Sequence, residues 1–254
     1  MGRHFNMTSS ELKTAARHAL KENFIQKLLL LIVPLLLSFI SNRVTQSYSN
    51  NINHNVQTSV SGVSNSTDAV AAIDWGLVLY TIIPVVVIVL LISFFISIII
   101  TVFQTAAMFN YLDIFRGEKE EINLSTDIFR AFKEGYFWKI AGLSFVISII
   151  MFILLFIPII GWGLMIYLGL SWSQATYVLY DKLKNDDYHG IWDVLAASKA
   201  LMVGYKFRYF LFNLTFIGWY FLDIISIGIS RIWTLPFITM SMVSFYEARI
   251  QDRL

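Results

Sequence analysis

The feature that most limits the fold is an uncharged, almost wholly apolar run over residues 75–109. A helix crosses the hydrocarbon core of a bilayer with about 20 apolar residues, so this run is too long for one perpendicular crossing. We expect it to tilt, to break near Pro84 or to continue into the cytoplasm. The whole chain is 57% hydrophobic and 14% charged, whereas soluble domains carry about 25% charged residues. The sequence therefore predicts an integral membrane protein.

Six segments are apolar enough to predict membrane-spanning helices. They lie at residues 25–41, 80–103, 140–158, 162–179, 208–229 and 232–246. We expect Pro34 to kink the first of them, because such kinks are tolerated in spans. Residues 42–74 are rich in Ser, Asn and Thr and have no periodicity, which predicts an irregular loop. The expected fold is all-α: a polytopic protein with one membrane domain over residues 1–254.

The positive charges predict how this domain is oriented. With the N-terminus inside, all but two of the 19 Lys and Arg residues fall on the cytoplasmic side, the exceptions being Arg43 and Arg231. Lys and Arg collect on the cytoplasmic side of membrane proteins. We therefore expect a multi-pass plasma-membrane protein with both termini cytoplasmic and the 42–74 loop extracellular.

One junction occurs three times along the chain. A short amphipathic segment is followed by a turn-forming residue and an aromatic residue, and then by a span; the pairs are Asn23-Phe24, Gly135-Tyr136 and Gly204-Tyr205. Asn and Gly both tolerate the left-handed backbone that ends a helix. We predict three repeated units, each a cytoplasmic interfacial helix plus a helical hairpin, at approximately 8–113 (with the 42–74 insertion), 125–181 and 190–247.

The amphipathic segments carry basic residues on one face. These residues are Lys13, Arg17 and Lys21 in the first segment, and Arg130 and Lys133 in the second. Basic amphipathic helices lie in the interface of an anionic leaflet, so we expect the inner leaflet of the bilayer to be a partner. The alternative, which is compatible with this, is that these helices pack on the helical bundle.

Each predicted unit ends in an acid, at Asp113, Asp181 and Glu247. We expect these acids to lie at the inner rim of the membrane and to pair with nearby Lys or Arg. Asp223 differs, because it lies inside an apolar segment, where an ionisable residue is by default a functional hypothesis. Two interpretations stay open: a structural or snorkelling role near the outer interface, with an ion pair to Arg231 or Arg43, or a site for an ion or substrate.

Motifs of catalysis are missing from the sequence. It has no H-E-x-x-H, no G-x-S-x-G and no phosphate-binding glycine loop. It has no cysteine, which excludes disulfides and thiolate chemistry, and its four histidines lie far apart in the chain. We therefore expect no enzyme, no catalytic residue, no metal, no cofactor and no nucleic-acid partner.

The C-terminal third resembles a family of bacterial integral membrane proteins, the domain of unknown function 975 family. The residues that carry this are "LTFIGW" at 214–219, Gly204 to Lys206, Gly228-Ile229-Ser230, Pro236-Phe237 and Phe245-Tyr246. The segments "ELKTAARHALKENF" and "YVLYD" resemble the opening and the middle of the family. Ser230 replaces a family glycine and Phe237 a tyrosine. The resemblance implies a multi-pass protein of Gram-positive-type bacteria, without an assigned activity or catalytic residue.

These observations favour a non-enzymatic scaffold or accessory component of an envelope or transport system. Such a protein would act with a membrane-protein partner or as a homo-oligomer. One alternative is a small oligomeric transporter or channel that uses Asp223. A further alternative is a membrane-embedded, lipid-modifying enzyme.

Overall fold

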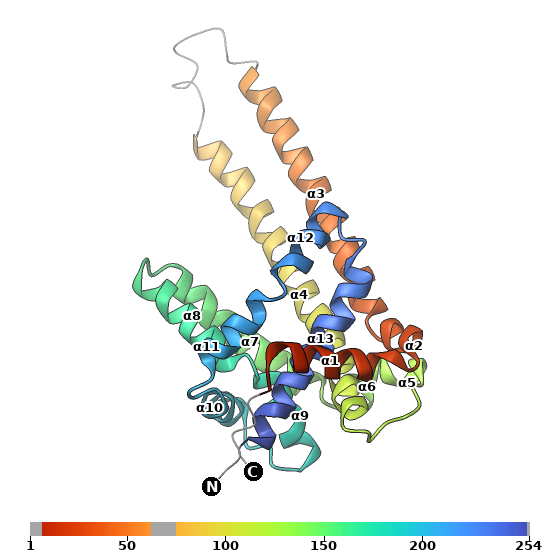
Figure 1. Ribbon diagram of the computed structural model, residues 1–254. Coiled ribbons are helices and arrows are strands. Elements are labelled where there is room, and N and C mark those ends of the chain that lie inside the picture. The colour runs from red at the N-terminus through yellow and green to blue at the C-terminus, as the bar shows by residue number, and fades with distance from the viewer. Residues whose placement is uncertain (1–6, 62–74, 253–254) are drawn as a thin grey trace. The chain divides into compact units, whose positions relative to one another are not determined.

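The computed structural model describes residues 7–61 and 75–252, and all regular structure in these ranges is helical (Figure 1). The predicted all-α class is therefore confirmed for the described chain. The chain divides into two compact units, Met1–Val33 with Thr101–Leu254 (unit 1) and Pro34–Ile100 (unit 2).

Two long helices run through unit 2, α3 (Ile32–Ser61) and α4 (Trp75–Phe115). α4 is continuous through Pro84, so the apolar run does not break there. Pro34 does not kink a helix either, because it lies in the first turn of α3, where the missing N–H has no partner to lose. The chain instead breaks just before α3, at the end of α2 (Phe24–Leu29).

The expectation of an irregular loop over residues 42–74 is wrong for residues 42–61, which continue α3. Extending a formed helix adds one hydrogen bond per residue and requires no new nucleus, so a polar continuation of an apolar helix is cheap. Side chains add to this, since Thr45 Oγ1 donates to the Ser41 carbonyl at 3.0 Å. Residues 62–74 lie outside the described part of the chain.

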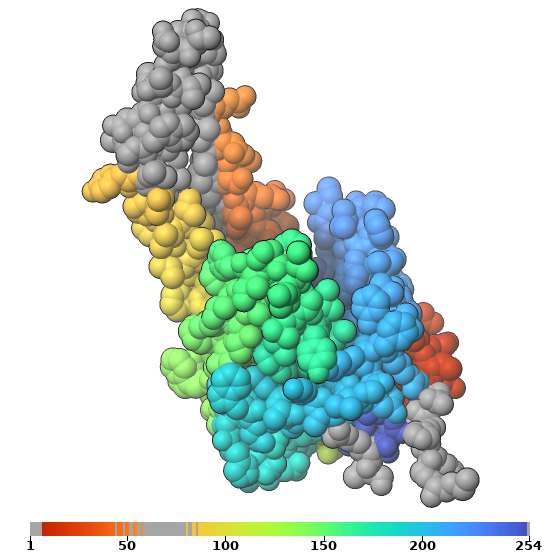
Figure 2. All heavy atoms as spheres, turned by 90° about the vertical axis from the view of Figure 1, so that its left-hand side faces the viewer, coloured from red at the N-terminus to blue at the C-terminus, as the bar shows by residue number. Residues whose placement is uncertain are grey.

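Unit 1 contains α2, the part of α4 from Thr101 onward, and the remaining helices. These remaining helices are α1 (Ser9–Lys21), α5 (Leu124–Asp127), α6 (Arg130–Lys133), α7 (Phe137–Leu155), α8 (Ile160–Trp172), α9 (Ala175–Lys184), α10 (Ile191–Leu201), α11 (Lys206–Leu214), α12 (Ile217–Ile225) and α13 (Arg231–Gln251). α10 packs against α7, α8 and α9. Figure 2 shows α10 in cyan below the green α7–α8 hairpin.

Besides the 25–41 segment, which breaks between α2 and α3, two more of the expected spans are interrupted in the structure. The 162–179 segment breaks between α8 and α9, and the 208–229 segment breaks between α11 and α12. A hydroxyl accompanies each break: Ser173 Oγ donates to the Leu170 carbonyl at 3.0 Å, and Thr215 Oγ1 donates to the Phe212 carbonyl at 2.6 Å. Such local bonds compete with the helical ladder.

By length and composition, two helical stretches of the described chain could cross a membrane, Val86–Phe115 and Phe137–Leu155. In α7 only 22% of the most apolar stretch is buried, which is unlike the core helix of a soluble protein. The α7–α8 hairpin also exposes large apolar side chains, among them Phe156 (70%) and Ile160 (77%). Contiguous exposed apolar surface marks a membrane or protein interface. These observations favour membrane association, and the six-span topology stays a prediction.

α1 lies across α13 (Figure 1). Leu12 packs in a buried cluster with Met202, Phe212, Phe216 and Phe245. Ser244 Oγ on α13 donates to the Leu12 carbonyl at 3.0 Å. The start of α1 is a capping box, in which the Thr8 and Glu11 side chains each bind the backbone N–H of the other. The first amphipathic segment thus packs on the helical bundle through its apolar face.

The left-handed backbone predicted for the three junctions is confirmed. The φ angles are +52° at Asn23, +70° at Gly135 and +79° at Gly204. In the turn between α7 and α8, however, the left-handed residue is Ile159 (φ +63°). Gly161 serves close packing there, because a Cβ would lie 2.2 Å from the Leu154 carbonyl oxygen. Superposition of three repeated units stays a prediction.

Candidate functional site

Charged side chains gather in unit 1 around the C-terminal end of α4. They come from segments far apart in the sequence: the end of α4 and the residue after it, α6, α9 and α13. We call this group the ionic cluster; its members are Asp113, Arg116, Arg130, Tyr180, Asp181, Lys184, Tyr246 and Glu247. All three acids predicted to pair with Lys or Arg belong to it.

Arg116 binds two of these acids. Its Nη1 and Nη2 donate to the two carboxylate oxygens of Asp181 at 2.6 and 2.9 Å, a bidentate pair. Its Nε donates to Glu247 Oε1 at 2.9 Å, and Nη2 lies 2.7 Å from the same oxygen. The Tyr246 hydroxyl donates to Asp181 Oδ2 at 2.6 Å. The three charged side chains retain only 12–20% exposure.

Asp113 is the centre of the second half of the cluster. Arg130 Nη1 lies 2.6 Å from Asp113 Oδ2, and the Tyr180 hydroxyl donates to Oδ1 at 2.5 Å. Lys184 Nζ lies 3.0 Å from Oδ1 and also pairs with Glu118. Arg130 Nη2 donates to the Tyr180 oxygen at 2.9 Å, which closes the network between α6 and α9.

Burial and opposite charge act against each other in this cluster. Burial lowers the pKa of Arg116, but the hydrogen bonds and charges of Asp181 and Glu247 outweigh it and raise the pKa above its ordinary value. Burial raises the pKa of Glu247, and Arg116 only partly reverses this. Each acid faces a guanidinium or an ammonium, so the geometry is that of a structural ion lock.

A smaller polar network next to the cluster was not predicted from the sequence. Lys119 Nζ lies 2.6 Å from Asp127 Oδ1 and donates to Asn110 Oδ1 at 2.8 Å. Buried Asn110 Nδ2 donates to the Asp127 carbonyl at 3.0 Å. A pocket of about 300 Å³ lies beside this network and Asp113, lined by acids and bases together. The signal in the sequence was an Asn inside an apolar helix, which needs buried partners.

The basic residues predicted for the membrane interface separate into two groups. Arg17, Lys21 and Lys133 are exposed, whereas the Lys13 Nζ donates to the Thr215 carbonyl at 3.1 Å. The prediction that Arg130 lies at the membrane interface is wrong, because its side chain is only 15% exposed and lies inside the ionic cluster. The reason is that α6 is a single turn directly beside Asp113, which offers a stronger partner than water or lipid headgroups.

Asp223 lies near the turn between α12 and α13 and is half-buried. Its carboxylate accepts hydrogen bonds from Ser230 Oγ and from Thr234 Oγ1, the latter at 2.9 Å. In the described chain it forms no ion pair with Arg231, whose side chain is exposed. Two hydroxyls on the facing turn and helix take the place of the expected cation.

The comparisons with known proteins bear on the C-terminal part of the chain. A family described as "Protein of unknown function (DUF975)" matches residues 142–253. No curated protein and no solved structure matches the chain. The matched stretch runs from within α7 to the end of α13 and includes Asp181, Asp223 and Glu247, and it contains the motif residues on which the resemblance rests. Over this stretch, the chain is similar to the DUF975 family.

Proposed function

We propose that this protein is a non-enzymatic scaffold or accessory component in a bacterial plasma membrane, with its termini and basic helices on the cytoplasmic side. One observation carries the proposal: each acid of the ionic cluster is bound by a cation at 2.6–3.0 Å. A general acid or base needs a group that is free to exchange a proton with a substrate. These acids instead tie α4, α6, α9 and α13 into one frame.

The exposed apolar hairpin α7–α8 supplies the surface for a membrane-protein partner or a second copy of the chain. A photo-crosslinking amino acid at Phe156 or Trp162, both exposed, tests this in intact cells. We expect an adduct of one defined mass at these positions. The same probe at buried Phe109 is the matched control. Lipid-only labelling at both exposed positions would contradict the scaffold proposal.

The orientation is tested by labelling single cysteines, because the natural chain contains none. A membrane-impermeant maleimide on intact cells should label Ile159→Cys and Ile229→Cys, which are exposed in the proposed outer turns. It should label Glu121→Cys and His189→Cys, both exposed, only after the membrane is opened. The reverse pattern would overturn the proposed topology.

A small oligomeric transporter or channel is a second candidate, favoured by Asp223, whose carboxylate is held by hydroxyls and not by a cation. Proteoliposomes containing the full chain test it. An ion flux that is lost in Asp223→Asn and kept in Asp187→Asn, an exposed acid paired with Lys182, would support transport. Under the scaffold proposal, these liposomes leak no faster than empty ones.

A further inference from the structure

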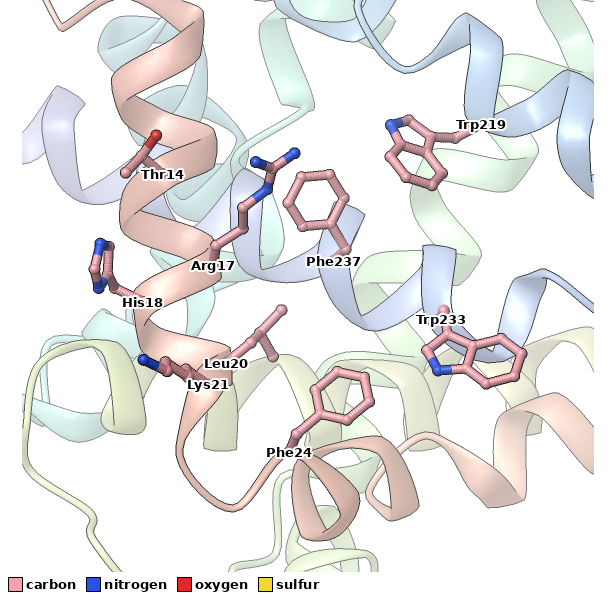
Figure 3. A pocket seen from close by; sticks show the side chains of 9 residues that line it. All are labelled: Thr14, Arg17, His18, Leu20, Lys21, Phe24, Trp219, Trp233 and Phe237. Atoms are coloured by element: carbon pink, nitrogen blue, oxygen red, sulfur yellow. The ribbon is translucent and has the colours of Figure 1, made fainter.

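A groove of about 570 Å³ opens in unit 1 between α1, α12 and α13. Figure 3 shows its two sides: Arg17 and Leu20 on α1 point toward the rings of Phe237, Trp219 and Trp233, whereas His18 and Lys21 extend to the other side of α1. Pockets of this size hold molecules as large as a cofactor or a drug. Its lining separates into an apolar part and a basic part.

Aromatic rings form the apolar part. Phe237 and Trp219 lie with their ring centroids 5.6 Å apart, and Phe24 faces them from α2 (Figure 3). Leu20 beneath them is only 4% exposed. This surface offers area to a hydrocarbon chain and few hydrogen-bonding groups. Trp233 is 58% exposed at the side of the groove, and Trp is enriched where membranes meet water.

The basic part is Arg17, which points into the groove, and Lys21, which lies one helical turn further along α1 with its ammonium on the His18 side (Figure 3). The Arg17 guanidinium lies 5.5 Å from the centroid of the Phe237 ring, at the boundary between the basic and the apolar parts. Both side chains are exposed, and neither forms an ion pair within the described ranges. Among the described residues, none that lines the groove is an Asp or a Glu. Two acids lie on or next to α1 but do not line the groove. Glu11 is held in the capping box at the start of α1, and Glu22 is the C-cap residue at its end.

We propose that this groove binds one anionic phospholipid, with the phosphate against Arg17 on the side toward Lys21 and an acyl chain along Phe24 and Phe237. Charge complementarity requires an anion, since two unpaired cations border a lining without acids. The aromatic surface requires a hydrocarbon chain, which a free phosphate does not have. The inference rests on the proposed cytoplasmic-membrane location of α1, where anionic headgroups and acyl chains are both within reach.

The test uses the intrinsic fluorescence of the purified full chain in detergent; two of its seven tryptophans, Trp219 and Trp233, line the groove. Phosphatidylglycerol and phosphatidylcholine, each brominated on the acyl chain, are added at equal mole fractions. We expect the brominated phosphatidylglycerol to quench more strongly, and the excess to vanish in Trp219→Phe/Trp233→Phe. Equal quenching by the two lipids would overturn the proposal, because the groove would then be apolar without charge selectivity.

Substitutions separate the groove from general surface charge. Arg17→Gln/Lys21→Gln should weaken phosphatidylglycerol binding roughly 30-fold, and either single substitution roughly 5-fold. Lys133→Gln/Lys199→Gln removes two exposed charges outside the groove and should leave binding unchanged. Equal weakening in both double variants would overturn the proposal, as would displacement of the lipid by glycerol 3-phosphate. Unchanged thermal unfolding shows that each variant is folded.

The outcomes also separate this inference from the proposed function. If the groove shows no preference for the anionic lipid while cysteine labelling gives the proposed topology, only the lipid site is wrong. If labelling reverses the topology while the preference persists in detergent, the site stands and the membrane orientation is wrong.

Discussion

Arg116→Met is the substitution that tests the ionic cluster most directly. Arg116 makes contacts of 2.6–2.9 Å with both Asp181 and Glu247, and its side chain is 18% exposed. Methionine keeps much of the apolar stem and removes the charge. The two carboxylates then face each other without a shared cation, in a place where water reaches them poorly.

The expected loss of folding stability follows from this burial. Removing one partner of a buried ion pair costs about 3–5 kcal/mol. The three side chains keep 12–20% exposure, so the lower end applies, and about 3 kcal/mol lowers Tm by roughly 6–12 °C in a chain of this size. The loss should also depend on pH through Glu247.

Burial raises the pKa of Glu247 above its ordinary value of 4.5. The folded protein therefore holds this proton more tightly than the unfolded chain does. The resulting stabilisation is complete below pH 4.5 and is lost as pH rises through the raised folded pKa. Without Arg116 this pKa rises further, because one counter-charge is gone. The lowering of Tm in Arg116→Met should thus be smaller at pH 5 than at pH 8.

Tryptophan fluorescence during heating in detergent, at both pH values, measures the effect. Arg116→Met/Asp181→Asn/Glu247→Gln should recover more than half of the lost Tm, since it removes the uncompensated charges. Lys133→Met, at an exposed position in the neighbouring α6, is the matched control. A Tm of Arg116→Met within 2 °C of the natural protein, or an equal deficit in the triple variant, would refute the reasoning.

Three further substitutions test local features by the same thermal unfolding measurement. Gly161→Ala should destabilise strongly, because the new Cβ would lie 2.2 Å from a carbonyl oxygen, whereas Gly163→Ala has no atom within 4 Å and should be neutral or stabilising by up to about 1 kcal/mol. Thr8→Ala should cost about 1 kcal/mol through loss of the α1 cap, and Thr14→Ala, within the same helix, should cost less. Gly204→Ala should cost about 1 kcal/mol through backbone strain alone, because φ is +79° and the Cβ meets no atom within 4 Å; an unchanged Tm would contradict this.

What could be predicted from the sequence was mostly local. The left-handed joints at Asn23, Gly135 and Gly204 follow from residues that tolerate this backbone, next to an amphipathic segment. The pairing of Asp113, Asp181 and Glu247 with cations follows from the cost of leaving a half-buried acid alone. These features are determined by interactions among a few neighbouring residues or by the chemistry of a single residue type.

Features set by competition between distant groups could not be predicted. Hydropathy does not reveal that Ser173 and Thr215 would bond to the preceding carbonyls where the apolar segments break. Arg130 appeared as one more basic residue of an amphipathic turn, because its partners Asp113 and Tyr180 lie 17 and 50 residues away. The Asp223 carboxylate accepts a hydrogen bond from Thr234, 11 residues further along the chain. The pattern of charges in the sequence instead indicates Arg231 as its partner.

The packing of α1 on α13 has a consequence for synthesis on the ribosome. The hydrogen bond between Ser244 and the Leu12 carbonyl spans 232 residues. At roughly 5–20 residues per second, α1 waits roughly 10–50 s for its partner helix to be translated. Throughout that interval its apolar face, with Leu12, Ala16 and Leu20, has no α13 to cover it. The nascent protein thus needs a temporary cover for α1, from the membrane surface or a chaperone, until α13 is made.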